Sequence, residues 1–494
     1  MLDNLILGFQ TAFTVENLLW CFVGVLLGTI IGLLPGLGST TGVAILIPLT
    51  LAFEPVTALI MLAGIYYGAQ YGGTITSVLL STPGEAPSVI TALDGYQMAR
   101  NGRAGAALAI AAIGSFIAAI ISLALLMAFA PPFARWALNF SPVENFAIMI
   151  FGLVIVITFG GGSFSRGLMM AALGVLISTV GVSVGFIDAR FTFGNVNLLS
   201  GIPFVEVMIG VFALGEVFHQ IRSGAVAPIR ARFKDLMITR GELKRSIFPI
   251  LRGTGIGFTL GTLPGAGSTL ASFMAYGIER KVSKNGSKFG TGQIEGVASP
   301  ESANNAAANA NFIPTLALGI PGGATTAVLL GAFTIYGLQP GPLLFEKQPE
   351  LVWGLLVSFF IGNVFLLILN LPMAPVFAQM LRVPYGYLYP LILLTSVIGA
   401  YSISNNTFSI WLVFVFGLLG YLLKEYDYPL APFVLGVVLG PLFEKAMAQT
   451  SAIGEGNFMI LFDRPISFTI IVMTALMIAI PPAVRKIRSR SKAS

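Results

Sequence analysis

One hexapeptide occurs twice in this sequence, as PGLGST at 35–40 and as PGAGST at 264–269. Glycine lets the backbone turn and lets a ligand come close, and Ser and Thr are typical helix N-caps. The free amides of a helix start attract anions, helped by the helix dipole. We therefore predict that the two copies together bind an anionic solute. The candidate residues are Gly36, Gly38, Ser39, Thr40, Gly265, Gly267, Ser268 and Thr269.

Each hexapeptide is followed by one further helix-breaking segment. STPGEA at 81–86 follows the first copy, and IPGGATT at 320–326 follows the second. Proline removes a backbone donor, so such breaks are tolerated in a membrane only where they are buried or line a watery cavity. We expect their hydroxyl groups to face the same solute. Tight surface turns and simple helix kinks are the alternatives. The candidates here are Ser81, Thr82, Thr325 and Thr326.

The stretch ASPESANNAAANANF at 298–312 is the most polar part of any apolar segment. Asn304 and Asn305 lie one helical turn after Glu301, so the three side chains can meet. We predict that these two amides, with the carbonyls at Pro321 and Gly322, bind a coupling cation, and Na⁺ is the only metal expected. Contacts that merely hold helices together are the alternative. The roles of Glu85, Asn309 and Asn311 stay open.

The elements that would position these residues are apolar helices. The chain of 494 residues is 56% hydrophobic and 10% charged, with a mean hydropathy of +0.88, whereas soluble proteins have about 25% charged residues. Apolar runs of membrane-spanning length recur, for example at 104–130 and 351–371. The sequence predicts an all-α polytopic membrane protein with about 11–12 transmembrane helices plus broken or re-entrant helical hairpins.

Basic residues predict how the chain threads the bilayer, because cytoplasmic loops are rich in Lys and Arg. The loops 222–245 and 279–288, the tail 485–494 and Arg100 with Arg103 are expected in the cytoplasm. Five basic residues then lie outside, so 27 − 5 = 22 of the 27 Lys and Arg residues are cytoplasmic. This threading puts the C-terminus in the cytoplasm and the N-terminus in the periplasm.

The duplicated motifs belong to a longer internal repeat. Residues 32–50 match 261–279, and 77–90 match 315–329. The loop after the first hairpin has no basic residue and the loop after the second has several, so the copies are predicted to have opposite orientations. Inverted repeats with broken helices are typical of secondary transporters. The predicted organisation is repeat one (1–221), a cytoplasmic basic linker (222–245), repeat two (246–484) and a cytoplasmic basic tail (485–494).

Several segments resemble the large membrane subunit of tripartite tricarboxylate transporters, the TctA type. They include YYGAQYGGTITSVLLSTPGEAPSVITALDGYQMARNGRAG, PESANNAA and GLQPGPLLF. The resemblance implies ion-gradient-driven uptake of citrate-like or other carboxylates across the bacterial inner membrane, with Na⁺ or H⁺ as the coupling ion. It also implies two partners, a small membrane subunit of about four helices and a periplasmic solute-binding protein, and no nucleic acid.

Other functions are weighed against this one. An enzyme needs clustered catalytic groups, and the sequence shows no HExxH motif and no Ser-His dyad, so we expect no enzymatic activity. A Walker loop, GxxxxGK[ST], is absent as well. A carboxylate channel, or a permease subunit powered by a separate ATPase, is the alternative function.

Overall fold

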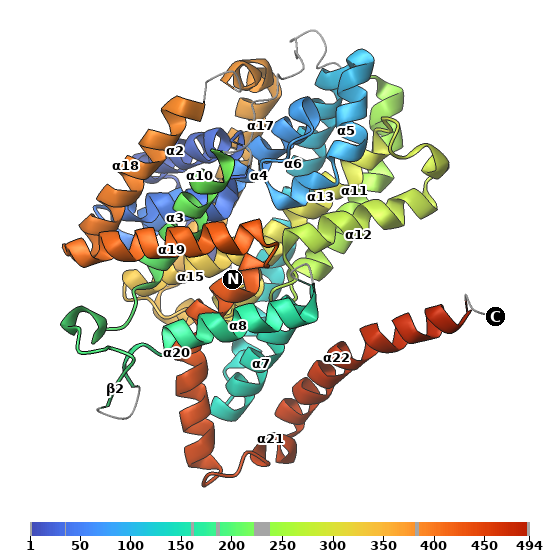
Figure 1. Cartoon of the computed structure of the whole chain (residues 1–494). Helices are drawn as coiled ribbons and strands as arrows, with labels where there is room; N and C mark the ends of the chain where they lie inside the picture. The colour runs from blue at the N-terminus through green and yellow to red at the C-terminus, as the bar shows by residue number, and fades with distance from the viewer. Residues whose placement is uncertain are drawn as a thin grey trace. The chain divides into compact units, whose positions relative to one another are not determined.

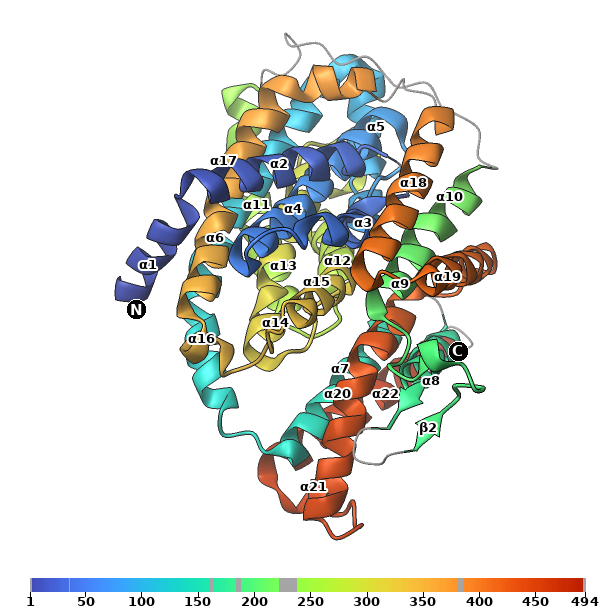
Figure 2. The same cartoon turned by 90° about the vertical axis from the view of Figure 1, so that its left-hand side faces the viewer.

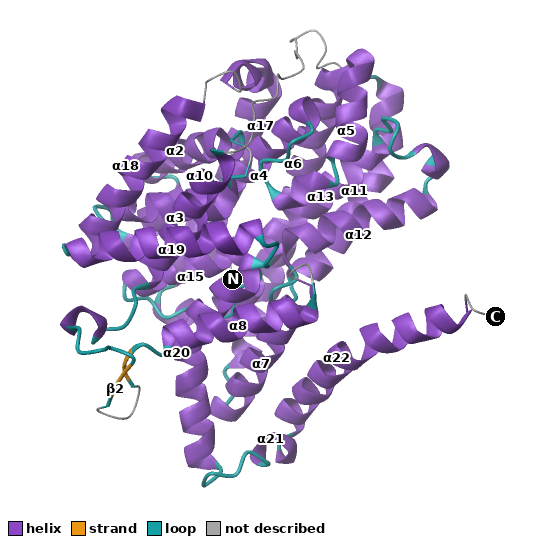
Figure 3. Ribbon diagram, viewed as in Figure 1, coloured by secondary structure: helices purple, strands orange, loops and turns teal. Residues whose placement is uncertain are grey.

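The structure is a computed structural model, and it describes residues 2–34, 36–159, 163–183, 188–221, 238–380 and 385–491. Most of these residues are helical (Figure 3). The strands β1 (Gly181–Val182) and β2 (Ala189–Arg190) form one short antiparallel pair. Most of the predicted basic linker and the last three residues of the tail lie outside the described residues.

Five helical spans among the described residues are long and apolar enough to cross a membrane. They are Val15–Gly32, Ala92–Ala137, Pro349–Met373, Thr407–Glu425 and Leu430–Ile453. Six shorter apolar helices accompany them. The prediction of an all-α polytopic membrane protein is confirmed, and the number of crossings stays a prediction.

The chain divides into two compact units, each built from two separate stretches (Figure 1). Unit 1 comprises Met1–Ala134 and Val205–Leu422, and unit 2 comprises Arg135–Phe204 and Leu423–Ser494. The helices of unit 1 are α1 (Leu2–Ala12), α2 (Val15–Gly32), α3 (Gly38–Thr50), α4 (Pro55–Leu80), α5 (Ala92–Met98), α6 (Ala104–Ala137), α9 (Phe204–Met208), α10 (Gly215–Gln220), α11 (Arg240–Gly261), α12 (Gly267–Val282), α13 (Glu295–Ala310), α14 (Phe312–Leu318), α15 (Ala324–Ile335), α16 (Leu344–Lys347), α17 (Pro349–Met380), α18 (Tyr385–Ser404) and α19 (Thr407–Glu425).

Unit 2 is a smaller helical bundle. Its helices are α7 (Pro142–Phe159), α8 (Phe164–Ser178), α20 (Leu430–Ile453), α21 (Ile460–Asp463) and α22 (Pro465–Ser491). Helix α20 packs on both α7 and α8. Gly174 and Gly436 make the α8–α20 contact close, because a Cβ atom at either would lie within 2.4 Å of a carbonyl oxygen of the other helix.

The internal repeat appears in the helix packing of unit 1. Gly24, Gly28 and Gly32 of α2 lie directly against the backbone of α4 at Met61, Ile65 and Ala69. Glycines 229 positions later, Gly253, Gly257 and Gly261 of α11, lie in the same way against Ser299, Ala303 and Ala307 of α13. Glycine at every fourth position lets two helix backbones come together. The same close helix pair is therefore built twice.

The helix breaks correspond as well. The turn before α3 has φ of 85° and 62° at Gly36 and Gly38, and the turn before α12 has 76° and 64° at Gly265 and Gly267. These left-handed values favour glycine. The glycine of each later Pro-Gly pair donates to a threonine hydroxyl, Gly84 N to Thr76 Oγ1 at 2.9 Å and Gly322 N to Thr315 Oγ1 at 3.3 Å.

Helices α4 and α13 form the interior of unit 1 (Figure 2). Every residue of α13 is buried, although the helix carries two glutamates and three asparagines. Buried polar groups are costly unless they are paired or used for function. The polar interior of α13 therefore indicates a functional core beside the helix breaks.

Candidate functional site

The two hexapeptide turns reach the same short segment of the chain. We call residues 36–40 tip one and residues 265–269 tip two. In tip one, Ser39 Oγ and Thr40 Oγ1 lie 2.8 and 2.9 Å from Thr325 Oγ1. In tip two, Gly267 N donates to the carbonyl oxygen of Gly322 at 3.2 Å. Both tips therefore contact residues 322–325, as expected if they build one site.

The Ser and Thr residues of the tips do not cap their helices. Helix α3 begins at Gly38 and α12 begins at Gly267, and neither N-cap residue makes a side-chain hydrogen bond. The expectation that Ser39 and Thr40 are N-caps is therefore wrong. The left-handed glycines start each helix one residue earlier, so the hydroxyl groups lie in the first turn. Those of Ser39 and Thr40 contact Thr325 of a neighbouring segment, and Thr269 is exposed.

Tip one is already bound to an anionic side chain of the protein. The backbone amide of Ser39 donates to the carboxylate of Glu85, which follows the Pro83-Gly84 break. A carboxylate at a helix N-terminus is stabilised by the exposed amides and by the helix dipole. The sequence analysis predicted a solute anion at this helix start, and the structure places the carboxylate of Glu85 there instead.

Tip two lacks such a side chain. Pro83-Gly84 matches Pro321-Gly322 at an interval of 321 − 83 = 238, so Gly323 stands where repeat one has Glu85. A Cβ atom on Gly267 would meet nothing within 4 Å. The Ser268 side chain is 6% exposed, and its Oγ has no hydrogen-bond partner among the described residues. The start of α12 therefore has open space and an unused buried hydroxyl.

The remaining hydroxyl candidates have local roles or none. Thr326 Oγ1 accepts from Gly323 N at 2.9 Å, so it closes the first turn of its own helix. Ser81 ends α4 in the left-handed conformation and is exposed, and Thr82 is half-buried. Within the described part of the chain, no hydrogen bond joins Ser81 or Thr82 to either tip.

The asparagines of α13 divide into two kinds. Asn305 Nδ2 donates to Ser115 Oγ at 2.7 Å, and Asn309 Nδ2 donates to Ser122 Oγ at 2.8 Å. These two residues therefore join α13 to α6, which is the helix-joining role weighed above. Neither side-chain polar atom of Asn304 has a partner among the described residues. Asn304 thus remains available for a ligand, as does Oδ1 of Asn305, which has no partner among the described residues either.

Two tyrosines of α4 lie against the polar stretch 298–312. The hydroxyl of Tyr66 faces Ser268 and lies 3.3 Å from the side-chain amide of Asn311. The Tyr67 hydroxyl donates to Asn309 Oδ1 at 2.5 Å. Their place in the segment 65–74, which corresponds in repeat one to the polar stretch, indicates them from sequence, but it does not distinguish packing from binding.

Comparison with known proteins identifies the family. Residues 18–435 match the model of the family described as "Tripartite tricarboxylate transporter TctA family". The chain belongs to the TctA family. It is therefore a transporter subunit and a multi-pass protein of the inner membrane.

Two relatives of this TctA-family chain come from Agrobacterium vitis. An uncharacterised 52.8 kDa protein in the TAR-I ttuC' 3' region is 45% identical over 493 residues, which cover 99% of this chain and 98% of the relative. An uncharacterised protein in the TAR-II ttuC' 3' region is 44% identical over 236 residues, 47% of this chain and 98% of the relative. No solved structure matches the chain.

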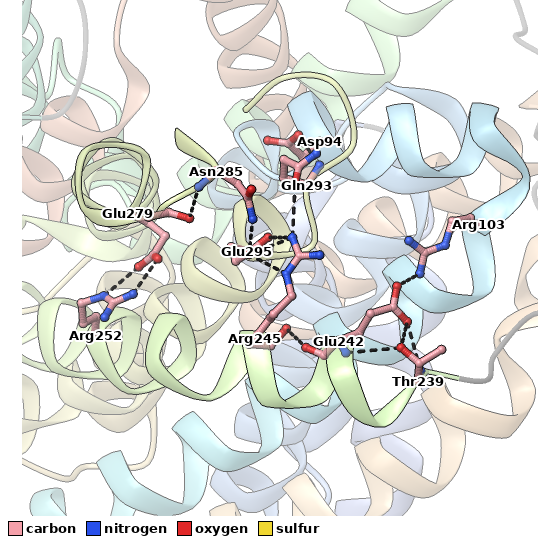
Figure 4. Close-up of polar contacts among 12 residues, drawn as sticks. Asp94, Arg103, Thr239, Glu242, Arg245, Arg252, Glu279, Asn285, Gln293 and Glu295 are labelled. Carbon is pink, nitrogen blue, oxygen red and sulfur yellow. Dashed lines mark hydrogen bonds and ion pairs between the residues drawn. The ribbon is translucent and has the colours of Figure 1, made fainter. Parts of the chain in front are cut away.

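Charged residues of this TctA-family chain gather where three segments predicted to be cytoplasmic meet (Figure 4). Arg103 pairs with Glu242, and Arg245 Nη2 lies 2.9 Å from the carboxylate of Glu295. Asp94 accepts from the backbone amide of Gly290 at 2.9 Å. Segments around residues 100, 240 and 290 thus share one polar cluster, as expected if they lie on one side of the membrane.

Glu242 of this cluster has a shifted pKa. Partial burial alone would raise its pKa, but hydrogen bonds from Thr239 and the nearby Arg103 guanidinium outweigh burial and lower the pKa of Glu242 below its ordinary value. Its carboxylate also completes a capping box with Thr239 at the start of α11. The helix that leads to tip two is therefore anchored by an ionised side chain.

Proposed function

We propose that this protein is the translocating subunit of a binding-protein-dependent tripartite transporter that takes up carboxylates by ion-driven symport. A small membrane subunit and a periplasmic solute-binding protein are the proposed partners. Sodium or protons supply the driving force, and the C-terminus lies in the cytoplasm. The TctA family and the apolar helices support the transport role, and the two tips support the choice of an anionic solute.

The observation that carries the proposal is the meeting of both broken hairpins at residues 322–325. The first turns of α3 and α12 both contact residues 322–325, and helix N-termini attract anions. Because Glu85 already occupies the start of α3, the carboxylate of the solute binds at the start of α12. Ser268 and Thr269 receive it there, beside Gly267, whose own amide donates to the carbonyl oxygen of Gly322.

The neutral groups around this position give the solute its orientation. The hydroxyls of Ser39, Thr40 and Thr325 form one connected group on the side of tip one. They can donate to a second carboxylate or accept from a hydroxyl of the solute. Asn304, Asn305 and the backbone at Pro321 and Gly322 are the proposed ligands of a coupling cation. Movement of a repeat-based unit then exposes the site to the cytoplasm.

Uptake by the reconstituted transporter tests this proposal. The chain, the small membrane subunit and the candidate binding protein are placed in proteoliposomes with a panel of mono-, di- and tricarboxylates. Sodium and pH gradients are imposed separately. We expect accumulation of at least one carboxylate that an ionophore abolishes and that needs no ATP.

The alternative functions give different results in the same experiment. A channel would equilibrate the solute without accumulating it, whether or not an ion gradient is present. A permease subunit with a separate ATPase would accumulate nothing until ATP and that ATPase were added. Either result would refute ion-driven symport.

A further inference from the structure

A small cavity beside the middle of α13 is lined by oxygen atoms that lack partners. Its polar lining consists of Tyr71, Thr74, Ser115, Glu301 and Asn370, and the rest of the lining is apolar. The volume of the cavity, counted as space for the centre of a water molecule, is about 10 Å³. This is close to the volume that one water molecule requires. The cavity therefore has room for one water molecule or one small ion.

Among the described residues that line this cavity, only Glu301 is charged. Its side chain is 1% exposed, and it has no ion pair within the described residues. Thr91 Oγ1 donates to Oε1 at 2.5 Å and Thr74 Oγ1 donates to Oε2 at 2.8 Å. A carboxylate that accepts at both oxygens has the pattern of the ionised form. A buried negative charge of this kind requires a compensating positive charge.

The neutral oxygens in the cavity lining are free to bind a cation. The hydroxyl of Tyr71 and Oδ1 of Asn370 have no partner among the described residues. Asn370 Nδ2 is used by its own helix, where it donates to Leu366 O at 3.0 Å, so Oδ1 is the free atom. Ser115 Oγ accepts from Asn305 Nδ2 and keeps a second lone pair. Hard cations take such oxygen ligands.

We propose that this cavity binds one sodium ion through the carboxylate of Glu301 and the oxygens of Tyr71, Ser115 and Asn370. A monovalent ion matches the single carboxylate, whereas a divalent ion would leave an uncompensated positive charge in the interior. The site differs from the cation ligands predicted from sequence, since Asn304, Asn305, Pro321 and Gly322 do not line it. Asn305 takes part only through its bond to Ser115.

The position of the site links it to the tips. Helix α4 carries both Tyr71 in the cavity and Tyr66, which faces Ser268 of tip two. Helix α13 carries Glu301 and, one turn later, Asn304. A sodium ion that fixes α4 against α13 would therefore also fix the groups around the solute. This coupling role rests on the proposed function, but the binding of sodium does not.

Sodium binding to the purified full chain tests the inference without any carboxylate present. Equilibrium dialysis with radioactive sodium is run in detergent, with choline chloride holding the ionic strength constant. We expect one sodium ion per chain. We expect Glu301→Gln to weaken the affinity by at least about tenfold, and Asn370→Leu by about fivefold.

Asn363→Leu is the matched control, because Asn363 lies on the same helix as Asn370 and has the same local contacts. Its Nδ2 donates to Phe359 O at 2.7 Å and its Oδ1 has no partner among the described residues, yet it does not line the cavity. It should bind sodium as the parent chain does. Tyr71→Phe, which removes only the hydroxyl, replaces Glu301→Gln if that variant does not fold, and should weaken binding by about threefold.

Three results would overturn the inference. They are a parent chain that binds no sodium, a folded Glu301→Gln variant that binds it unchanged, and equal losses in Asn363→Leu and Asn370→Leu. The proposed function fails separately. Sodium binding without carboxylate uptake would refute the transport role alone, and proton-driven uptake without sodium binding would refute only this site.

Discussion

Tip one and tip two have the same sequence pattern and the same backbone turn, but they differ in charge. The first turn of α3 is bonded to Glu85, and the carboxylate of Glu216 lies beside Gly36. Gly323 stands in place of Glu85 in repeat two, and the space next to Gly267 is open. The two helix starts thus differ through the residue that follows the Pro-Gly break. Glu85 supplies an internal anion to the start of α3, whereas Gly323 leaves the start of α12 able to receive an external anion.

Adding the missing carboxylate to tip two should have the largest effect. Gly323 has an extended backbone with φ of −166°, and a Cβ atom there would have its nearest neighbours at 3.5 Å, so a side chain fits. Gly323→Glu should place an internal anion at the start of α12 and reduce carboxylate uptake by about a hundredfold or more, as like charges repel inside a low-dielectric site. Initial rates in proteoliposomes measure it.

Gly323→Gln is the matched control for that variant, because it adds nearly the same volume without the charge. It should keep at least ten times more uptake than Gly323→Glu, a difference of about 1.4 kcal/mol or more. Equal losses in the two variants would show that crowding is responsible, and the difference in charge between the tips would then have no functional meaning.

Removing the carboxylate from tip one is the reverse experiment. Glu85→Ala leaves the amide of Ser39 without its acceptor and should lower the free energy of unfolding by about 2 kcal/mol, as hydrogen bonds to charged groups contribute about 1.5–3 kcal/mol. Added formate should restore part of the lost thermal stability, because it can occupy the vacated helix start. Thermal unfolding in detergent measures both changes.

Formate should leave the parent chain unchanged in that assay, since Glu85 already fills the position. A Glu85→Ala variant as stable as the parent, or one that formate does not stabilise, would contradict the assignment of Glu85 as the internal anion.

Equivalent serines in the two tips should differ in their effect on solute affinity. Ser268→Ala removes the unpartnered hydroxyl at the open helix start and should weaken carboxylate binding by about tenfold, the value of one hydrogen bond to a charged group. Ser39→Ala removes a hydroxyl that bonds to Thr325 and should weaken it by no more than about threefold. Titration calorimetry compares the variants, and a larger loss in Ser39→Ala would reverse the assignment.

The smallest expected effect concerns the anchor of the helix that leads to tip two. The pKa of Glu242 is lowered in the folded chain, so its contribution to stability is complete above the unfolded value near 4.5 and is lost as the pH falls through the folded value. Glu242→Gln should cost about 0.5–1 kcal/mol at pH 7 and less at pH 3. Thermal unfolding at the two pH values checks this, and an equal cost at both would exclude the charge as the cause.

The sequence analysis predicted the helical membrane fold, the internal repeat and the positions of the breaks. Such features follow from composition and local backbone chemistry. Long apolar runs predict helices, and paired glycines at 36 and 38 and at 265 and 267 predict turns with positive φ.

Side-chain partners could not be predicted in the same way. Glu85 was visible as an acidic residue beside a break, but its bond to Ser39 spans 46 positions of the chain. The pairing of Ser39 with Thr325 spans 286 positions. Contacts of this kind depend on how α3, α4 and α15 pack, and no local pattern encodes that packing.

The sequence by itself determined where this protein breaks its helices and that it does so twice, because glycine, proline and hydroxyl residues act on their own neighbourhood of the backbone. Only the tertiary structure decided which helix start binds a carboxylate of the protein itself and which remains without one. That decision depends on whether a side chain from a distant segment reaches the helix start, and Glu85 reaches one start while Gly323 has no side chain to reach the other.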